Sequence, residues 1–94
     1  MKNFLILHYG FEKPTPDQMG AWNRWFASIA DKQVDRGGFP AGREISHSGT
    51  QELPFAKDSI TGYTVIEAED LDAAEKIAAE CPIVISTRVY EIRK

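Results

Sequence analysis

Two histidines are the first side chains of this sequence to consider for chemistry. His8 lies near the end of the apolar run "FLILHYG", and His47 lies in the polar stretch "GREISHS". A histidine titrates near neutral pH, so either one could act as a general base or donate a ligand bond. Alternatively, His8 is a strand-end residue bonded to backbone and His47 is simply solvated. Asp58 could orient either imidazole, or it could bond its own backbone in a turn. We take His8 and Asp58 as the candidate catalytic residues.

Other polar and aromatic side chains could bind a ligand. Arg43 lies in an expected strand, where its forked guanidinium would suit a carboxylate or phenolate. It could equally point outward or form an ion pair. Trp22 could form the wall of a pocket for a planar molecule or pack in the core. Tyr63 offers a phenol to a pocket or a buried ring with one satisfied hydroxyl. The candidate ligand-binding residues are Arg43, His47, Tyr63 and Trp22.

Several chemistries are excluded by residue types that are missing or wrongly spaced. The single cysteine, Cys81, rules out a disulfide within the chain and a tetrathiolate metal site. The spacing of the histidines from Asp58 or Glu44 matches no known metal motif. The sequence has no Gly-rich phosphate loop, no Gly-x-Ser-x-Gly and no His-Glu-x-x-His. We therefore expect neither a metal nor a cofactor.

Length and charge exclude further classes of protein. The chain has 94 residues, which predicts a single domain over residues 1–94. Its net charge of −3 offers no basic field for a nucleic acid. No apolar run approaches the roughly 20 residues that a membrane span needs. One unpaired cysteine fits a reducing, cytoplasmic compartment.

The first half of the chain predicts a strand and a helix. Residues 2–9 are apolar at both alternating positions, which is typical of a strand buried on both faces. "TPDQ" (Thr15–Gln18) then offers a capping box with proline at the first helical position. Apolar side chains recur at helical spacing after it. Gly37 and Gly38 predict that this helix ends near residue 36.

The second half predicts two well-marked strands around a helix. Residues 42–48 indicate a short, polar edge strand, and residues 49–58 a loop. Residues 59–68 are rich in β-branched and aromatic side chains and predict a strand. Asp70 can cap a second helix that Pro82 ends. Residues 83–92 predict the last strand.

This βαββαβ order predicts a ferredoxin-like α+β fold. Its four strands form an antiparallel sheet, with the first and third in the centre and both helices on one face. The other face would then expose apolar side chains, which soluble monomers rarely tolerate over several hundred Å². The simplest cover is the same face of a second copy. We therefore expect a homodimer that packs sheet to sheet.

Two blocks of the sequence, "KNFLILHYGFEKPTPDQMGAWNRWF" and "SITGYTVIEAEDLDAAEKIAAECP", resemble the YCII-related domain family, including its DGPF-motif members. The resemblance implies a ferredoxin-like unit that pairs into a dimeric α+β barrel. Some members resemble small-molecule enzymes with a His–Asp pair, one of them dechlorinating, whose histidine lies on the first helix. Here that helix contains no histidine. "ELPF" keeps Pro54 and Phe55 of the DGPF motif but not its Asp-Gly.

Two functions remain open at this point. The first is binding of a small molecule, with aromatic ones included, and cofactor-independent acid–base chemistry. There His8 would act as base, Asp58 or His47 would orient it, and Arg43 would hold a substrate anion. The alternative is a non-enzymatic binding or interaction module in which His8 is structural.

Overall fold

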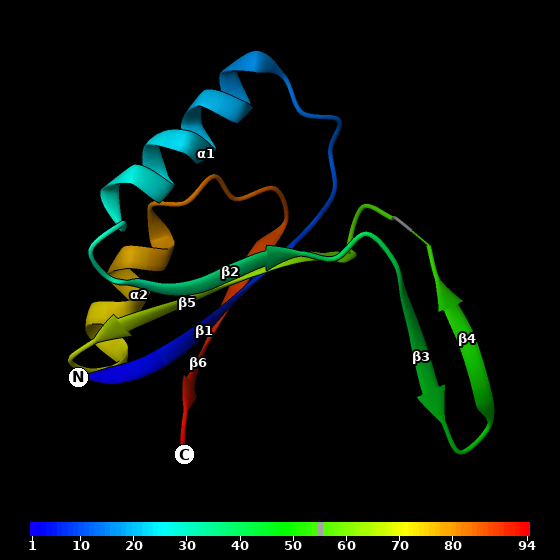
Figure 1. Ribbon diagram of the computed structural model, residues 1–94. Coiled ribbons are helices and arrows are strands. Elements are labelled where there is room, and N and C mark those ends of the chain that lie inside the picture. The colour runs from blue at the N-terminus through cyan, green and yellow to red at the C-terminus, as the bar shows by residue number, and fades with distance from the viewer. Residues whose placement is uncertain (55) are drawn as a thin grey trace.

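The computed structural model describes residues 1–54 and 56–94 and contains two helices and six strands (Figure 1). Four of the strands form one antiparallel sheet in the order β2-β5-β1-β6, and β3 and β4 form a separate hairpin. The elements in chain order are β1 (Lys2–Tyr9), α1 (Pro16–Ser28), β2 (Gln33–Gly38), β3 (Gly42–Ser46), β4 (Gly49–Leu53), β5 (Ile60–Ala68), α2 (Leu71–Ala79) and β6 (Ser86–Ile92).

The four-stranded sheet confirms the predicted α+β, ferredoxin-like class. β1 is central, as expected, with β5 along one edge and β6 along the other. Both helices lie on one side of this sheet, and the hairpin projects away from it (Figure 1). The hairpin is an addition to the simple βαββαβ pattern.

The core lies between the sheet and the helices. Alternate residues of the two central strands point into it, including Phe4, Ile6 and Ile66, which are fully buried. Trp25 of α1 completes this layer, and its indole N–H donates to the carbonyl of Ile77 in α2 at 3.0 Å. That bond ties the two helices together over the sheet.

No helix or strand of residues 1–54 and 56–94 covers the opposite face of the sheet, which we call the open face. The residues of each strand that alternate with the buried ones lie on this face. Among them, Leu5 pairs with Val65 on β5 and with Tyr90 on β6. Leu5 and Val65 are half-buried, and Tyr90 is 48% exposed. The middle of the open face is therefore apolar, as the two-sided apolar pattern of β1 predicted, while Arg88 lies opposite Leu7, and Asn3 and Glu67 lie toward one end.

The first helix is shorter than the sequence predicted. It begins at the Thr15 capping box but ends at Ser28 rather than near residue 36. The carbonyl of Ile29 accepts from the N–H groups of Lys32 and Gln33, which closes a turn. Residues Gln33–Gly38 then form the edge strand β2 along β5. The apolar stripe of the helix stops at Ile29, so the prediction wrongly extended it over a polar strand.

The segment after β2 also differs from the prediction. Residues 42–46 form a strand, but β3 pairs with β4 instead of the main sheet. The predicted loop over residues 49–58 contains β4 (Gly49–Leu53). His47 and Ser48 form the tight connection between them, and Gly49 follows with a φ of 129° that favours glycine. Both strands are polar, so no apolar alternation marked them.

The second half of the chain follows the prediction closely. Asp70 caps α2 by accepting from the N–H of Ala73 at 2.8 Å. The last strand, β6, begins at Ser86 rather than at residue 83. None of the helices in the described part of the chain is long and apolar enough to cross a membrane.

Candidate functional site

His8 lies on the helix-covered face of the sheet, not on the open face. Its side chain is 8% exposed. Its Nε2 lies 3.0 Å from the hydroxyl of Thr64 on β5, and its Nδ1 lies 4.0 Å from the Cys81 sulfur. The Cys81 sulfur lies 3.6 Å from the hydroxyl of Thr87. His8 is thus one member of a buried polar row that crosses three strands and the end of α2.

Burial determines the charge of this histidine. Its imidazole packs edge to face against Trp22 and Trp25, with ring centroids 5.0 and 5.8 Å away. Removal from water disfavours the charged imidazolium and lowers the pKa of His8 to about 4. The same effect raises the pKa of the Cys81 thiol. At neutral pH the site therefore holds a neutral imidazole beside a neutral thiol.

His8 also lines a pocket of about 400 Å³ between α1 and the β2–β5 edge of the sheet, which we call the His8 pocket. Trp22 and Phe26 stack with centroids 5.6 Å apart along the helix. The Arg36 guanidinium lies 4.1 Å from the centre of the Phe26 ring, an arrangement that attracts a cation to the ring face. The complete lining is His8, Trp22, Phe26, Arg36, Gly37, Gly38, Thr61, Gly62 and Tyr63.

Tyr63 is held in place at the edge of this pocket. Its hydroxyl donates to the Asp35 carboxylate at 2.9 Å, and its ring stacks on Phe39 with centroids 5.5 Å apart. The hydrogen bond to Asp35 is the largest cause that raises the pKa of Tyr63. The ring crosses Gly37 so closely that a Cβ there would lie 2.6 Å from Tyr63 Cε1.

We expect Gly37→Ala to displace the Tyr63 ring, because a methyl group cannot fit at that distance. The bond to Asp35 should then weaken, and the pKa of Tyr63 should fall toward its ordinary value of 10.0. Ultraviolet titration of the tyrosines measures this change. The matched control is Gly38→Ala, whose Cβ would lie 3.8 Å from the nearest atom, the Thr61 carbonyl oxygen. Equal tyrosine titration curves for both variants would contradict the close packing at Gly37.

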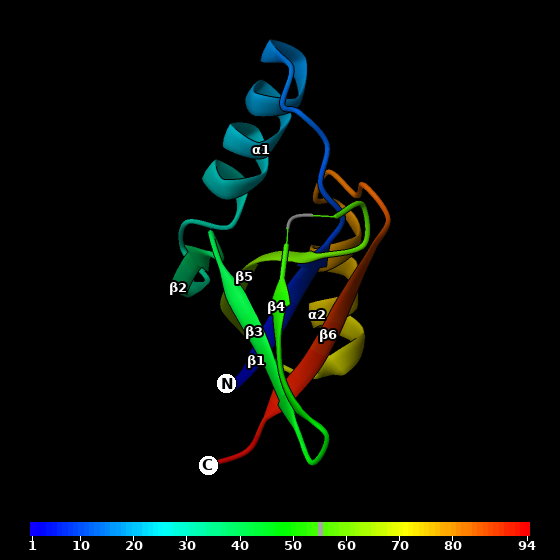
Figure 2. The same cartoon turned by 90° about the vertical axis from the view of Figure 1, so that its right-hand side faces the viewer.

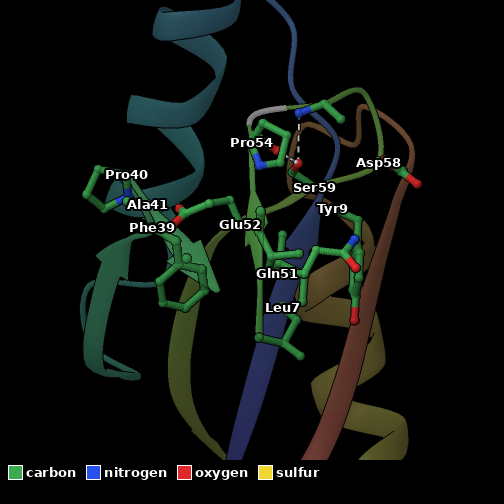
Figure 3. A pocket seen from close by; sticks show the side chains of 14 residues that line it. Leu7, Tyr9, Phe39, Pro40, Ala41, Gln51, Glu52, Pro54, Asp58 and Ser59 are labelled. Atoms are coloured by element: carbon green, nitrogen blue, oxygen red, sulfur yellow. Dashed lines mark hydrogen bonds between the residues drawn. The ribbon is translucent and has the colours of Figure 1, made fainter. Parts of the chain in front are cut away.

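A second and larger cavity, which we call the hairpin cleft, lies between the open face and the base of the β3–β4 hairpin (Figure 3). Its volume is about 750 Å³. Leu7 and Tyr9, the neighbours of His8 on β1, contribute to its floor. The Ser59 hydroxyl accepts from the Ala56 N–H at 2.8 Å and donates to the Pro54 carbonyl at 3.1 Å, which fixes the loop along one side. His8 lies on the other side of the sheet from this cleft.

The structure brings together some of the candidate site residues and separates others. His8, Trp22 and Tyr63 line one pocket. Asp58 lines the hairpin cleft. The Arg43 Nε donates to the Glu52 carboxylate at 2.8 Å within the hairpin, and His47 is exposed in its turn. Neither ring nitrogen of His8 bonds a carboxylate in the described part of this chain. Phe55, the motif match, lies outside the described residues.

Sequence reasoning missed two members of the His8 site. Thr64, the partner of Nε2, is fully buried on the same strand face as Ile66. A polar residue at a buried position of β5 was the available signal. Arg36 was placed at the end of the overlong helix, and recognising β2 would have placed it beside the pocket.

No metal site accompanies these pockets: residues 1–54 and 56–94 contain no group of three or more histidine, cysteine, aspartate or glutamate side chains that could hold an ion. The chemistry available to the His8 pocket in one chain is therefore that of a neutral imidazole, aromatic ring faces and one guanidinium.

The sheet with both helices on one face defines the class: a ferredoxin-like α+β unit. Within this class, the model of the YCII-related domain matches residues 11–94, and the chain belongs to the YCII-related family. A solved structure with the same fold is 5-chloro-2-hydroxyhydroquinone dehydrochlorinase (TftG) from Burkholderia phenoliruptrix AC1100, in complex with 2,5-dihydroxybenzoquinone. The two share 18% identity with a TM-score of 0.61, over 97% of this chain and 93% of that one. A search of the curated proteins finds no match.

Proposed function

We propose that this protein binds a small planar molecule with an anionic oxygen in the His8 pocket. The observation that carries the proposal is the convergence of a neutral imidazole, two aromatic ring faces and the Arg36 guanidinium on one cavity. Ligand pockets in proteins are mostly apolar with a few placed polar groups, and this lining has that character. Its volume of about 400 Å³ is in the range for a single-ring molecule.

Each group has a distinct role in this proposal. Trp22 and Phe26 offer ring faces and edges to a planar ligand. Arg36 offers two parallel N–H donors to a carboxylate or phenolate. Tyr63 marks the edge of the pocket. The dehydrochlorinase with the same fold is described in complex with a quinone, an oxygenated single-ring molecule, which supports this class of ligand here.

Acid–base chemistry would follow if the bound ligand raises the pKa of His8. A base whose conjugate acid has a pKa of about 4 removes protons poorly at neutral pH. An anionic oxygen close to the ring would favour the imidazolium and raise this pKa. Nδ1 is the nitrogen with the weaker contact, 4.0 Å to the Cys81 sulfur, so it is the one we assign to proton transfer. In this account Thr64 orients the ring.

A second candidate function, binding without catalysis, rests on a different observation. Both nitrogens of His8 already face protein groups, Thr64 and Cys81, and the described chain supplies no carboxylate to the ring. In that case His8 is a satisfied structural residue and the pocket only binds. Turnover of a bound ligand separates the two candidates, since binding alone consumes none.

Fluorescence of the two tryptophans tests the binding proposal. We expect benzoate or salicylate to quench Trp22, and Arg36→Gln to weaken the affinity about tenfold through loss of a charge-assisted bond. Arg24→Gln, which removes an exposed arginine on α1, is the matched control and should leave the affinity unchanged. Equal affinities in both variants, or quenching by neither compound, would overturn the proposal.

We also infer that the protein is a homodimer that packs through the open face. Leu5, Leu7 and Val65 are half-buried on that face, and Tyr90 is 48% exposed. An exposed apolar patch in the middle of a sheet face is rarely left to solvent in a monomer. Pairing with the same face of a second copy covers it with a self-complementary contact. Dimeric α+β barrels with this fold pair in this way, which supports the inference.

A further inference from the structure

We propose that the β3–β4 hairpin is an arm that packs on the second copy of the chain and closes the hairpin cleft from the partner's side. This inference rests on the homodimer inferred above, and it concerns a segment that the dimer through the open face does not require. It assigns the hairpin cleft to the space between subunits. The occupant of the cleft is thus the partner chain.

Among the described residues, the two strands of the hairpin pair only with each other. All ten residues of its two strands are exposed, and within the described residues no helix or other strand packs against them. On the face that lines the cleft, Leu53 is 49% exposed. In Figures 1 and 2 the hairpin extends beyond the sheet as a separate ribbon. An isolated two-stranded hairpin is at best marginally stable in water, so this one needs a surface to pack on.

The size of the molecule supports the same conclusion. A folded monomer of 10.5 kDa is expected to expose roughly 5400 Å². This chain exposes 6913 Å², an excess of about 1500 Å². Its radius of gyration, 14.3 Å, also exceeds the value of about 12 Å expected for a compact domain of this length. The excess area is comparable to what each subunit loses in an obligate dimer, about 1000 Å² or more.

Continuity with the open face identifies the partner as a second copy. The cleft under the arm is lined by Leu7 and Tyr9 of the open face and by Leu53 of the arm, so the apolar surface runs from one to the other. Glu52 lines the cleft, and the Arg43 guanidinium neutralises its carboxylate at 2.8 Å. Asp58 is the other carboxylate in the lining, so the surface that faces the cleft is mostly apolar with one net negative charge. It suits the apolar open face of a second copy.

The proposed arm changes what we expect of two candidate ligand-binding residues. Arg43 and His47 lie on it, apart from the His8 pocket of their own chain. In the proposed dimer both residues lie on a segment that packs against the partner subunit. Any role they have in a ligand site then depends on dimerisation.

Hydrogen exchange of the full-length protein at two concentrations tests the arm. Above the dimer dissociation constant we expect the amides of β3 and β4 to be protected at least about tenfold more than below it. Sedimentation on the same samples reports the oligomeric state. Dimers with unprotected β3–β4 amides would overturn the arm and leave the homodimer standing. A monomer at every concentration would overturn both, and equal protection in monomer and dimer would overturn the arm.

A pair of point variants locates the contact on the arm. Leu53 lies on the hairpin face that lines the cleft, and Thr50 lies on the opposite face with Ile45. We expect Leu53→Lys to weaken dimerisation roughly 10- to 100-fold, since it removes a buried leucine contact from each subunit. Thr50→Lys adds the same charge and should leave the dissociation constant unchanged. Equal constants for the two variants would contradict an arm that packs through its cleft face.

Discussion

Lowering the pH from 6.5 to about 4 should reduce the free energy of unfolding by up to about 3 kcal/mol through His8 alone. The pKa of this histidine is about 4 in the folded protein and 6.5 when unfolded. Across this interval the unfolded chain binds a proton that the folded chain does not. The free energy of unfolding therefore rises as the pH rises from about 4 to 6.5. Above pH 6.5 the contribution of His8 to this free energy is complete. Urea unfolding at a series of pH values measures how steeply the free energy of unfolding changes with pH.

His8→Gln isolates the histidine from the carboxylates that titrate near the lower end of the window. Glutamine keeps a polar partner for Thr64 but carries no titrating group. We expect a lower stability at neutral pH and a flatter pH dependence than in the natural chain. His47→Gln is the matched control, because its side chain is exposed in the hairpin turn. Curves for His8→Gln and the natural chain that stay parallel across the window would contradict a neutral, buried imidazole.

Leu5→Glu should convert the dimer to a monomer at micromolar concentration. Leu5 occupies a central strand on the open face between Val65 and Tyr90. In a sheet-to-sheet dimer a glutamate there is desolvated without a partner, at a cost of several kcal/mol for each subunit. That corresponds to a loss of about a thousandfold or more in affinity. Sedimentation equilibrium measures the dissociation constant of the dimer.

The control for Leu5→Glu adds the same charge away from the sheet. Ala27 is exposed on α1, so Ala27→Glu should leave the dimer intact. The far-ultraviolet circular dichroism of both variants should match that of the natural chain, because Leu5 is only half-buried in the monomer. If Leu5→Glu remains as dimeric as Ala27→Glu, the open face is not the dimer interface.

The central elements of the fold could be predicted from the sequence because each carries a local signal. β1 and β5 are long runs of β-branched, aromatic or aliphatic residues, and Thr15 and Asp70 cap the helices as expected. The polar strands carry no such signal. β2 contains "VDRGG" and depends on pairing with β5, so its structure is set by a tertiary contact. β3 and β4 pair only with each other.

The site was harder to predict for a related reason. β1 is apolar at both parities, so its sequence cannot say which face His8 occupies. The packing of Trp22 and Trp25 against the His8 imidazole shows that His8 lies on the helix-covered face. Arg36 can be assigned to the pocket only when it is known that α1 ends at Ser28 and that Gln33–Gly38 form β2. Conversely, Arg43 and His47 looked like pocket residues because the expected edge strand would have lain in the main sheet.

The central claim is that His8, as a neutral imidazole, forms part of the wall of the pocket that takes the ligand. Nitrogen-15 spectra of the two imidazoles during titration with benzoate and salicylate at neutral pH test it directly. We predict that the free protein shows a neutral His8, that ligand shifts its ring nitrogens, and that the His47 signals stay in place. A protonated His8 in the free protein, or a His8 that neither compound moves, would contradict the account.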